Sequence, residues 1–271
     1  MSKIAFGVQN AFSRVPFSGN PAATILTEAP LDDSLMHAIA AEIGCPATSF
    51  VVRREEEIRV RWFTPTGREI ALCGHGAIAA THRLYELFPE FPDRLTLRAP
   101  SNEVFVGKMP DGSIQLSLPL RAVAKVATDT PLVRAALAND AQFAALYKGR
   151  DYIALFASLE QVKALTPVAS RLDALDAYAL VAVAPSDGPD CDYVCRFFKS
   201  DKPGAEDIAN GACQSYVAPL MAKLLGRRSL RLKYLSARGG EMSVEVEGEA
   251  VQIRAPCITA IAGTLHLDGV C

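Results

Sequence analysis

The turn Cys73-Gly74-His75-Gly76 combines side chains and backbone groups that can do chemistry. It follows an apolar run at 58–63 that predicts a strand, and it precedes a helical pattern that begins at Ala77. Glycines let the backbone approach a ligand closely, and the N–H groups of a helix N-terminus bind anions such as a carboxylate. The same position favours the thiolate form of Cys73. The turn therefore predicts an anion site beside an activated thiol.

A second copy of this arrangement lies near residue 205. Arg196-Phe-Phe corresponds to Arg61-Trp-Phe, Glu206 to Glu69, and Asn210-Gly211-Ala212 to Cys73-Gly74-His75. An apolar helical face follows, and Gly226 is placed to end that helix. The repeat predicts a duplicated α/β unit whose two helix N-termini face one cleft. Chance similarity of two ordinary strand–turn–helix units is the alternative.

Length, composition and charge exclude several classes of function. The 271 residues are 50% hydrophobic with a net charge of −2, which suits one large or two medium domains and argues against nucleic acid or an acidic membrane as the main partner. No apolar run has the length of a membrane span, and the N-terminus has no signal-peptide core. Seven scattered cysteines are typical of reduced thiols, so we expect a cytoplasmic protein. We expect neither a metal nor an organic cofactor, because no ligand cluster or nucleotide-binding fingerprint is present.

The remaining pattern predicts an α+β chain. A turn at 13–21 has a polar tip at Asn20, and a charged turn lies at 53–57. Asp32 or Asp33 caps a helix that Gly44 ends. Further helices are expected at 77–87, 132–138, 159–165 and 172–175, and strands at 4–12, 22–26, 50–52, 58–62, 95–97, 104–106, 114–118, 152–156, 177–183, 230–234, 242–246, 251–254 and 261–267.

Several motifs, in order along nearly the whole chain, carry a resemblance to a known family. Phe-Ser-Gly-Asn-Pro-Ala-Ala (17–23), Trp-Phe-Thr-Pro (62–65), Glu-Ile-Ala-Leu-Cys-Gly-His (69–75) and Arg-Phe-Phe (196–198) with Glu-Asp (206–207) resemble the PhzF family of phenazine-biosynthesis isomerase-like proteins. The resemblance implies the diaminopimelate epimerase fold, with two pseudo-symmetric lobes that are each a sheet rolled round a central helix. Loss of periodicity near 122 places the lobes at 1–121 and 122–260, and the strand at 261–271 is a candidate to return to the first lobe. The resemblance also implies a homodimer.

The chemistry implied by the resemblance is cofactor-independent proton transfer on a small carboxylic acid. The family uses a glutamate and an aspartate, one from each lobe. Asp207 matches the aspartate, and His75 and Cys73 are intact. The residues expected to bind the substrate are Asn20, Gly74, Gly76, Asn210, Gly211 and Ala212.

Ala47 occupies the place of the family's glutamate, and alanine carries no proton. Cys45 or Cys73 is a candidate replacement. Asn10, Asn210, Ala212 and Gln214 depart from the family's usual Asp, Thr, Ser and His. The leading hypothesis is an isomerase with Asp207 and His75 as proton carriers and Cys73 as a candidate third group.

Other readings remain open. One is a ligand-binding protein of this fold that has lost catalysis. Another is a cysteine-dependent racemase or epimerase, which is disfavoured because the second cysteine of such enzymes falls at Asn210. At the level of single residues, Asp207 could cap a helix, His75 could only orient a neighbour, and Asn20 could only support its turn. Cys73 could be a packing residue, and Cys213 is expected in the core.

Overall fold

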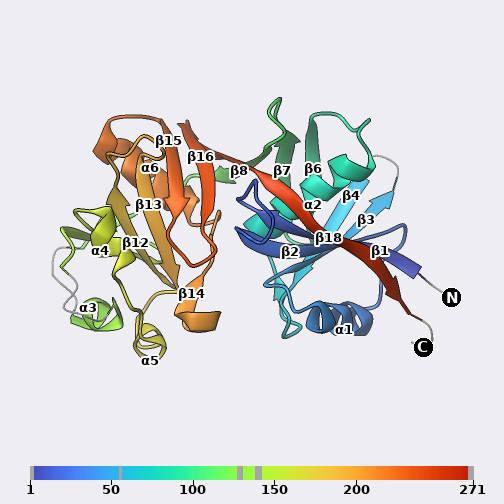
Figure 1. Ribbon diagram of the computed structural model, residues 1–271, viewed down its shortest axis with the longest axis horizontal. Coiled ribbons are helices and arrows are strands. Elements are labelled where there is room, and N and C mark those ends of the chain that lie inside the picture. Colours follow the sequence, from blue (N-terminus) through green and yellow to red (C-terminus); the bar gives the residue numbers. More distant parts are fainter. Residues whose placement is uncertain (1–2, 55–56, 127–130, 138–141, 268–271) are drawn as a thin grey trace. The chain divides into compact units, whose positions relative to one another are not determined.

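The chain divides into two compact units. Figure 1 shows the computed structural model, which describes residues 3–54, 57–126, 131–137 and 142–267. Unit 1 contains residues 1–117 and 254–271, and unit 2 contains residues 118–253. The sequence predicts these junctions at 121/122 and 260/261, whereas they fall within two strands, β8 (Ile114–Pro119) and β17 (Ala250–Ala255). Parts of the expected charged turn (55 and 56), helix (138) and last strand (268–271) lie outside the described residues.

Unit 1 is a mixed sheet whose strands follow the order β18–β1–β2–β3–β4–β6–β7–β8, with β5 also paired to β4. The β2–β3 and β4–β6 pairs are parallel, and the others are antiparallel. The strands not yet bounded are β1 (Lys3–Ala11), β2 (Asn20–Thr27), β3 (Thr48–Arg54), β4 (Glu57–Phe63), β5 (Glu69–Ile70), β6 (Arg94–Arg98), β7 (Glu103–Lys108) and β18 (Cys257–His266). The last strand, dark red in Figure 1, therefore lies beside the first.

The helix α2 (Gly74–Leu87) is the centre of unit 1. It contacts β7 and β18, which lie near opposite ends of the strand order, so the sheet curves around it. The consecutive residues Ala77, Ile78, Ala79 and Ala80 are all 0% exposed, as expected of a helix that is enclosed on most sides. Leu87, in the last turn beyond the enclosed part of the helix, is 40% exposed.

Helix α1 (Asp33–Ile43) ends at Gly44, as predicted. Gly44 has φ 68°, the left-handed conformation, and donates its N–H to the Ala40 carbonyl over 3.1 Å. The predicted side-chain cap is wrong, because Asp32 occupies the N-cap position without a capping hydrogen bond. Asp33 instead accepts a hydrogen bond from Arg61 over 2.6 Å.

Unit 2 repeats the strand order of unit 1. Its order is β9–β10–β11–β12–β13–β15–β16, with β14 also paired to β13 and with parallel pairs at β11–β12 and β13–β15. The bounds are β9 (Ala124–Lys125), β10 (Ala145–Lys148), β11 (Tyr152–Leu155), β12 (Leu180–Pro185), β13 (Tyr193–Phe198), β14 (Glu206–Asp207), β15 (Ser229–Tyr234) and β16 (Gly240–Glu247). Both parallel pairs recur at matching places, and so does the extra two-residue strand, which is β5 in unit 1 and β14 in unit 2. The two units therefore share one topology.

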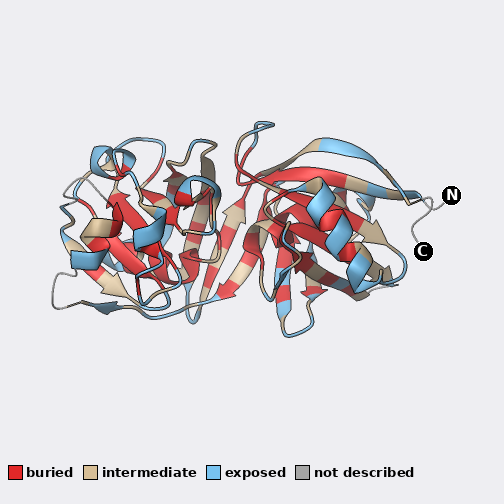
Figure 2. Cartoon of the chain, turned by 90° about the horizontal axis from the view of Figure 1, so that it is seen from below, coloured by how far each residue is buried: buried red, intermediate tan, exposed pale blue. Residues whose placement is uncertain are grey.

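The equivalent of α2 in unit 2 is α6 (Gln214–Leu225), which ends at Gly226 with φ 67°, as predicted. Leu224, in the last turn of α6, is 45% exposed. The smaller helices are α3 (Pro131–Leu137), α4 (Leu159–Lys163), α5 (Ala169–Leu172) and the 3₁₀ helix η1 (Pro203–Ala205). In Figure 2 the strands carry most of the buried residues, and exposed residues gather on loops and outer helices. Within the described ranges, no helix has the length and apolarity to cross a membrane.

Candidate active site

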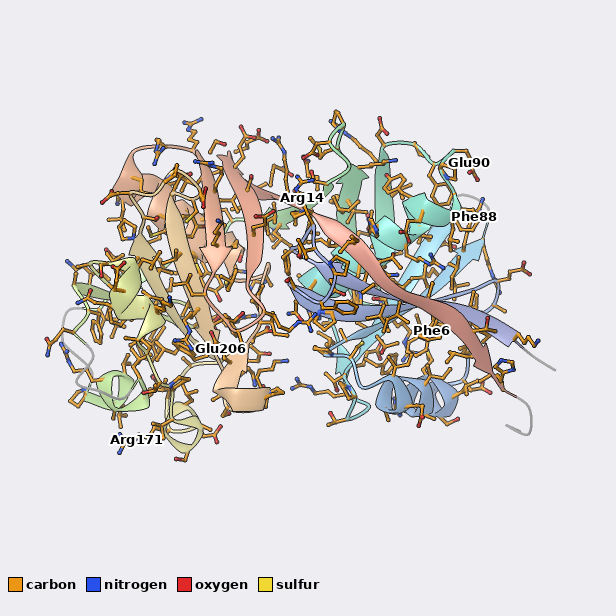
Figure 3. The ribbon with its side chains drawn as sticks, viewed as in Figure 1. Phe6, Arg14, Phe88, Glu90, Arg171 and Glu206 are labelled. Carbon is orange, nitrogen blue, oxygen red and sulfur yellow. The ribbon has the colours of Figure 1, made fainter. Side chains whose placement is uncertain are left out.

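An arginine–glutamate pair supports the glycine-containing turn of each unit. In unit 1, Arg61 on β4 donates two hydrogen bonds to Glu69 on β5, of 2.7 and 2.8 Å. In unit 2, Arg196 on β13 donates two to Glu206 on β14, both of 2.8 Å. Figure 3 labels Glu206. Paired N–H donors match the two oxygens of a carboxylate, so each pair fixes the short strand that leads into its turn. The repeat found in the sequence therefore recurs in the structure as the same arginine–glutamate contact in both units.

Asp207 occupies a position that holds an apolar residue in unit 1. On β14, Glu206 lies opposite Phe198 and Asp207 opposite Phe197. On β5, Glu69 lies opposite Phe63 and Ile70 opposite Trp62. The register thus makes Ile70 the equivalent of Asp207. Unit 2 alone carries a carboxylate at this place.

Cys73 and His75 lie together at the start of α2. Cys73 is the N-cap residue, 4% exposed, and its Sγ is 3.6 Å from Nδ1 of His75 and 3.9 Å from Nε2. His75 is half-buried. A thiol and an imidazole at this separation can exchange a proton. The structure therefore brings together two of the three predicted proton carriers.

Gly76 lets the turn pack closely against the sheet. A Cβ added at this position would lie 2.7 Å from Cδ1 of Trp62 and 3.0 Å from Sγ of Cys73. The Gly76 carbonyl also accepts a hydrogen bond from Ser49 Oγ on β3, over 3.2 Å. A side chain at residue 76 would thus displace either the tryptophan or the thiol.

Three other predicted positions in unit 1 are buried. Ala47 is 0% exposed, and its carbonyl accepts a hydrogen bond from the Ala23 N–H over 3.0 Å. Cys45 packs against Val8 and Ala23 in an apolar cluster, which is the environment of an inert core thiol. The expectation that Asn20 forms an exposed polar tip is wrong: Asn20 is the first residue of β2 and is 0% exposed. Its strand begins earlier than the predicted 22–26, because Asn20 pairs with Ala11 of β1.

The turn of unit 2 holds Asp207 through Asn210. Asp207 is 7% exposed, and Nδ2 of Asn210 donates a hydrogen bond to its Oδ2 over 3.0 Å. Oδ1 of Asn210 accepts a hydrogen bond from the backbone N–H of Cys213 over 3.0 Å. Asn210 was expected to contact substrate through its turn; here its side chain contacts the predicted proton carrier itself.

Gly211 and Ala212 lie in a 3₁₀-like approach to α6 rather than in its first turn. The N–H groups of Gln214, Ser215 and Tyr216 bond to carbonyls three residues earlier, at 3.0, 3.2 and 3.2 Å. Regular helix begins at Gln214, whereas α2 begins at Gly74, the residue aligned with Gly211. The two turns therefore differ by one helical turn. Their placement in one cleft stays a prediction.

A buried polar network behind Asn210 was not predicted from the sequence. Tyr234 Oη donates to the Asn210 carbonyl over 2.6 Å, and Gln214 Nε2 donates to Tyr234 Oη over 2.9 Å. Tyr193 Oη donates to Gln214 Oε1 over 2.7 Å. Cys213, fully buried as expected of a core residue, donates through Sγ to the same Asn210 carbonyl over 3.2 Å. The network's members lie on β13, β15 and α6, far apart in sequence, so spacing gave no signal for them.

Burial keeps these groups neutral. It raises the pKa of Tyr193, Cys213 and Tyr234 well above the ordinary values of a phenol or thiol. The network therefore has the character of a structural support with fixed donors and acceptors.

A separate buried carboxylate, Asp151, also lies in unit 2. It is 0% exposed and accepts hydrogen bonds from Arg150, of 3.0 and 3.2 Å, and from Tyr216 Oη on α6. Its charge is thus compensated within the unit.

Unit 1 contains a pocket of about 560 Å³ beside α1. Its walls include Met36, Phe50 and Val60, and its rim includes Arg59 and Arg98. None of the predicted site residues lines it. Among the residues that the structure describes, no three or more His, Cys, Asp or Glu side chains gather in a group that could hold a metal ion.

Comparisons with known proteins agree with the repeated topology. A family model described as phenazine biosynthesis-like protein, PhzC-PhzF, matches residues 9–264. An uncharacterized isomerase of Pseudomonas aeruginosa is 34% identical over 266 residues, which cover 98% of this chain and 100% of that protein. A second uncharacterized isomerase of the same species is 33% identical and covers 95% of this chain and 97% of its own length.

Solved structures with the same fold include a PhzF-family protein and an epimerase. A phenazine biosynthesis protein of the PhzF family from Enterococcus faecalis superposes with a TM-score of 0.92 at 29% identity and covers 98% of this chain and 100% of its own. A hydroxyproline epimerase from Agrobacterium vitis has a TM-score of 0.61 at 13% identity, over 99% of this chain and 94% of its own, and shows likeness of fold alone.

Proposed function

The chain belongs to the phenazine biosynthesis-like (PhzC-PhzF) family, and on that premise we propose that it is an isomerase that moves a proton on a small carboxylic acid without a cofactor. Such a reaction needs a base that removes a proton from one carbon and an acid that returns a proton to another. We assign the proton carriers to Asp207, His75 and Cys73. Relatives named isomerases support the reaction class. We expect the protein in the cytoplasm, because its scattered cysteines suit a reducing compartment.

The single observation that carries this proposal is the placement of Asp207. A carboxylate that is 7% exposed costs free energy unless it is hydrogen-bonded. The equivalent position in unit 1 holds Ile70, so the shared topology does not require a charge there. The backbone N–H of Cys213, the N-cap residue of α6, bonds to Oδ1 of Asn210. This contact gives Asn210 a role in supporting the start of α6 and favours Asp207 as the proton carrier.

Backbone N–H groups supply the natural site for the substrate's carboxylate. The first N–H groups of a helix have no partner within that helix, and Cys73 at the N-cap of α2 makes no side-chain capping bond. We therefore assign carboxylate binding to Gly74–Gly76, together with Asn210–Ala212 at the approach to α6. Asn20 keeps its assignment as a substrate-binding residue.

Two alternatives remain. Ala47 is fully buried and carries no proton, which favours a ligand-binding protein without catalysis. A cysteine-dependent racemase or epimerase is less well supported, because Asn210 stands where a second catalytic thiol would be. The nearest thiol in sequence, Cys213, is fully buried and donates its S–H to a backbone carbonyl.

Hydrogen exchange distinguishes these functions. The purified chain is incubated in heavy water with a panel of small unsaturated, cyclic and α-amino carboxylic acids, and deuterium at each carbon is followed by NMR. An isomerase incorporates deuterium at a carbon that gains a proton in the product. Replacing Asp207 by Asn keeps its shape but removes the proton carrier, so turnover should fall by about 10²-fold or more.

The outcomes separate the roles. Cys73→Ser should match the loss in Asp207→Asn if the thiol carries a proton, and should cost little if it only packs. Exchange solely at the α-carbon of an amino acid would indicate a racemase. Binding of acids with no exchange at any carbon would support the ligand-binding alternative. Full activity with lowered thermal stability in Asp207→Asn would remove Asp207 from the site.

A further inference from the structure

Asn210 joins the start of α6 to the carboxylate of Asp207. Its Nδ2 donates to Asp207 Oδ2, and its Oδ1 accepts from the Cys213 N–H, both over 3.0 Å. An ionised carboxylate only accepts hydrogen bonds, and a backbone N–H only donates them. A flipped amide would therefore turn both attractive contacts into repulsive ones. The two partners fix the orientation of the Asn210 side chain.

The main chain of Asn210 is held from the opposite side. Its carbonyl accepts hydrogen bonds from Tyr234 Oη over 2.6 Å and from Cys213 Sγ over 3.2 Å. Tyr234 is held in turn by Gln214, and Gln214 by Tyr193. These four side chains are between 0% and 3% exposed, so water does not compete for their bonds. Asn210 is consequently rigid at both its main chain and its side chain.

The carboxylate next to Asp207 in sequence is paired, and the buried thiol and phenol nearby are neutral. Glu206, next to Asp207 on β14, is bound by Arg196 of β13 through two hydrogen bonds of 2.8 Å. The thiol of Cys213 and the phenol of Tyr234 stay neutral because burial raises the pKa of each. The Asn210 amide contacts the Asp207 carboxylate directly.

We infer that Asn210 is a positioning residue for proton transfer, which holds Oδ2 of Asp207 and thereby fixes the plane of that carboxylate. This inference rests on the proposed function. A proton carrier held in one orientation reacts faster because less motion must be restricted at the transition state. Of the two glycine-containing turns, only that of unit 2 has this pair of residues. In unit 1, Cys73 stands at the place of Asn210 and Ile70 at the place of Asp207.

Two substitutions of Asn210 separate positioning from support of the helix. Asn210→Asp has the same shape and keeps an acceptor for the Cys213 N–H, but it loses the donor to Asp207. Asn210→Ala loses both bonds. A hydrogen bond to a charged group is worth a factor of about ten or more, so we expect kcat for deuterium exchange to fall at least about tenfold in both variants. KM should change little, and the melting temperature should fall in both variants, through the lost bond to the Cys213 N–H in Asn210→Ala and through repulsion between two carboxylates in Asn210→Asp.

A purely structural Asn210 gives a different result. Asn210→Asp, which keeps the acceptor for the Cys213 N–H, would then keep its kcat, and this result would overturn the inference. Adding Asp207→Asn provides a second readout. If Asn210 acts through Asp207, then Asn210→Ala should cost no further activity in the Asp207→Asn background, whereas independent effects would multiply.

The contact itself is tested without substrate. In a ¹H–¹⁵N spectrum, the side-chain amide signals of Asn210 are assigned by their loss in Asn210→Ala. One amide proton should be shifted downfield, and this shift should disappear in Asp207→Ala while the signals of other asparagines stay in place. If the chemical shifts of the Asn210 side-chain amide do not change in Asp207→Ala, the inference is contradicted even when exchange activity is found. If the amide shift depends on Asp207 as expected but none of the acids exchanges deuterium, the proposed function is contradicted instead.

Discussion

Gly76 is a residue at which close packing and helix propensity oppose each other. It lies inside α2, where alanine is ordinarily favoured over glycine by about 1 kcal/mol. An added Cβ, however, would approach Trp62 to 2.7 Å and Cys73 to 3.0 Å. Trp62 is 0% exposed, so a shift of its ring would disturb the side chains packed around it.

We therefore expect Gly76→Ala to destabilise unit 1. Forcing a methyl group into a packed interior costs about 1–3 kcal/mol, which exceeds the gain in helix propensity. Urea unfolding followed by tryptophan fluorescence measures the change, because Trp62 is the one tryptophan of the chain. Gly112→Ala is a control without neighbours within 4 Å, although its φ of 80° adds local strain. A variant at least as stable as the wild type would show that the turn adapts.

At the scale of elements, α2 and β18 are joined through one carboxylate. Glu86 on α2 accepts hydrogen bonds from Thr259 Oγ1 of β18 over 2.7 Å and from Arg83 over 3.1 Å. His82 Nε2 lies 3.2 Å from it, one helical turn earlier. The Glu86 side chain is 34% exposed, so burial opposes its ionisation only in part, and hydrogen bonds from His82, Thr259 and Arg83 lower its pKa to about 2.

This depressed pKa predicts the acid sensitivity of the pair. In the unfolded chain Glu86 titrates near its ordinary 4.5, so its contribution to stability is complete above that pH and is lost as the pH falls towards 2. Urea midpoints measured at pH 7 and pH 3 should differ less in Glu86→Gln than in the wild type. Glu90→Gln, at an exposed position labelled in Figure 3, is the matched control. An unchanged difference in Glu86→Gln would show that other groups govern acid unfolding.

The sequence predicts elements well where the signal is local. The left-handed glycines at 44 and 226 end their helices as expected, and the β3–β4 hairpin follows its apolar alternation. Predictions fail where tertiary packing decides. The helix expected at 172–175 lies at 169–172, the strand expected at 177–183 lies at 180–185, and β18 begins at Cys257 rather than at 261.

The candidate site shows the same division. The motifs identify Asp207, Cys73 and His75 by type and spacing, and the structure adds how each is held. The contact of Asn210 with Asp207 depends on a 3₁₀-like approach to α6 that no pattern marks. Tyr193 and Tyr234 come from separate strands, so only the folded sheet brings them to Gln214.

At the scale of the whole molecule, β18 is an exposed strand that suits association. Its sequence, Cys257–His266, contains no Asp, Glu, Lys or Arg, and Ile261 is 50% exposed. The described pairing of β18 is with β1. Charged residues usually protect edge strands from pairing, so an uncharged one is available to a second copy. The homodimer implied by family resemblance stays a prediction, and β18 is our candidate interface.

Sedimentation equilibrium tests this prediction. The wild type should have twice the chain mass of 29.1 kDa. Ile261→Lys should shift the equilibrium towards monomer, because a lysine would be buried between the two strands. Phe105→Lys on β7, where the native side chain is 58% exposed, is a control that should leave the dimer intact. If the wild type is a monomer, the predicted dimer is wrong. If Ile261→Lys and Phe105→Lys associate equally well, β18 is not the interface.

The pairing of β1 with β18 also has a consequence for how the chain is made on the ribosome. Lys3 of β1 lies opposite His266 of β18, so β1 leaves the exit tunnel long before its partner strand is translated. Unit 2, residues 118–253, is complete in sequence before that partner is translated. Domains generally fold as units during synthesis. The second half of the chain is thus free to fold first, and β1 spends most of translation with one long edge open to chaperones.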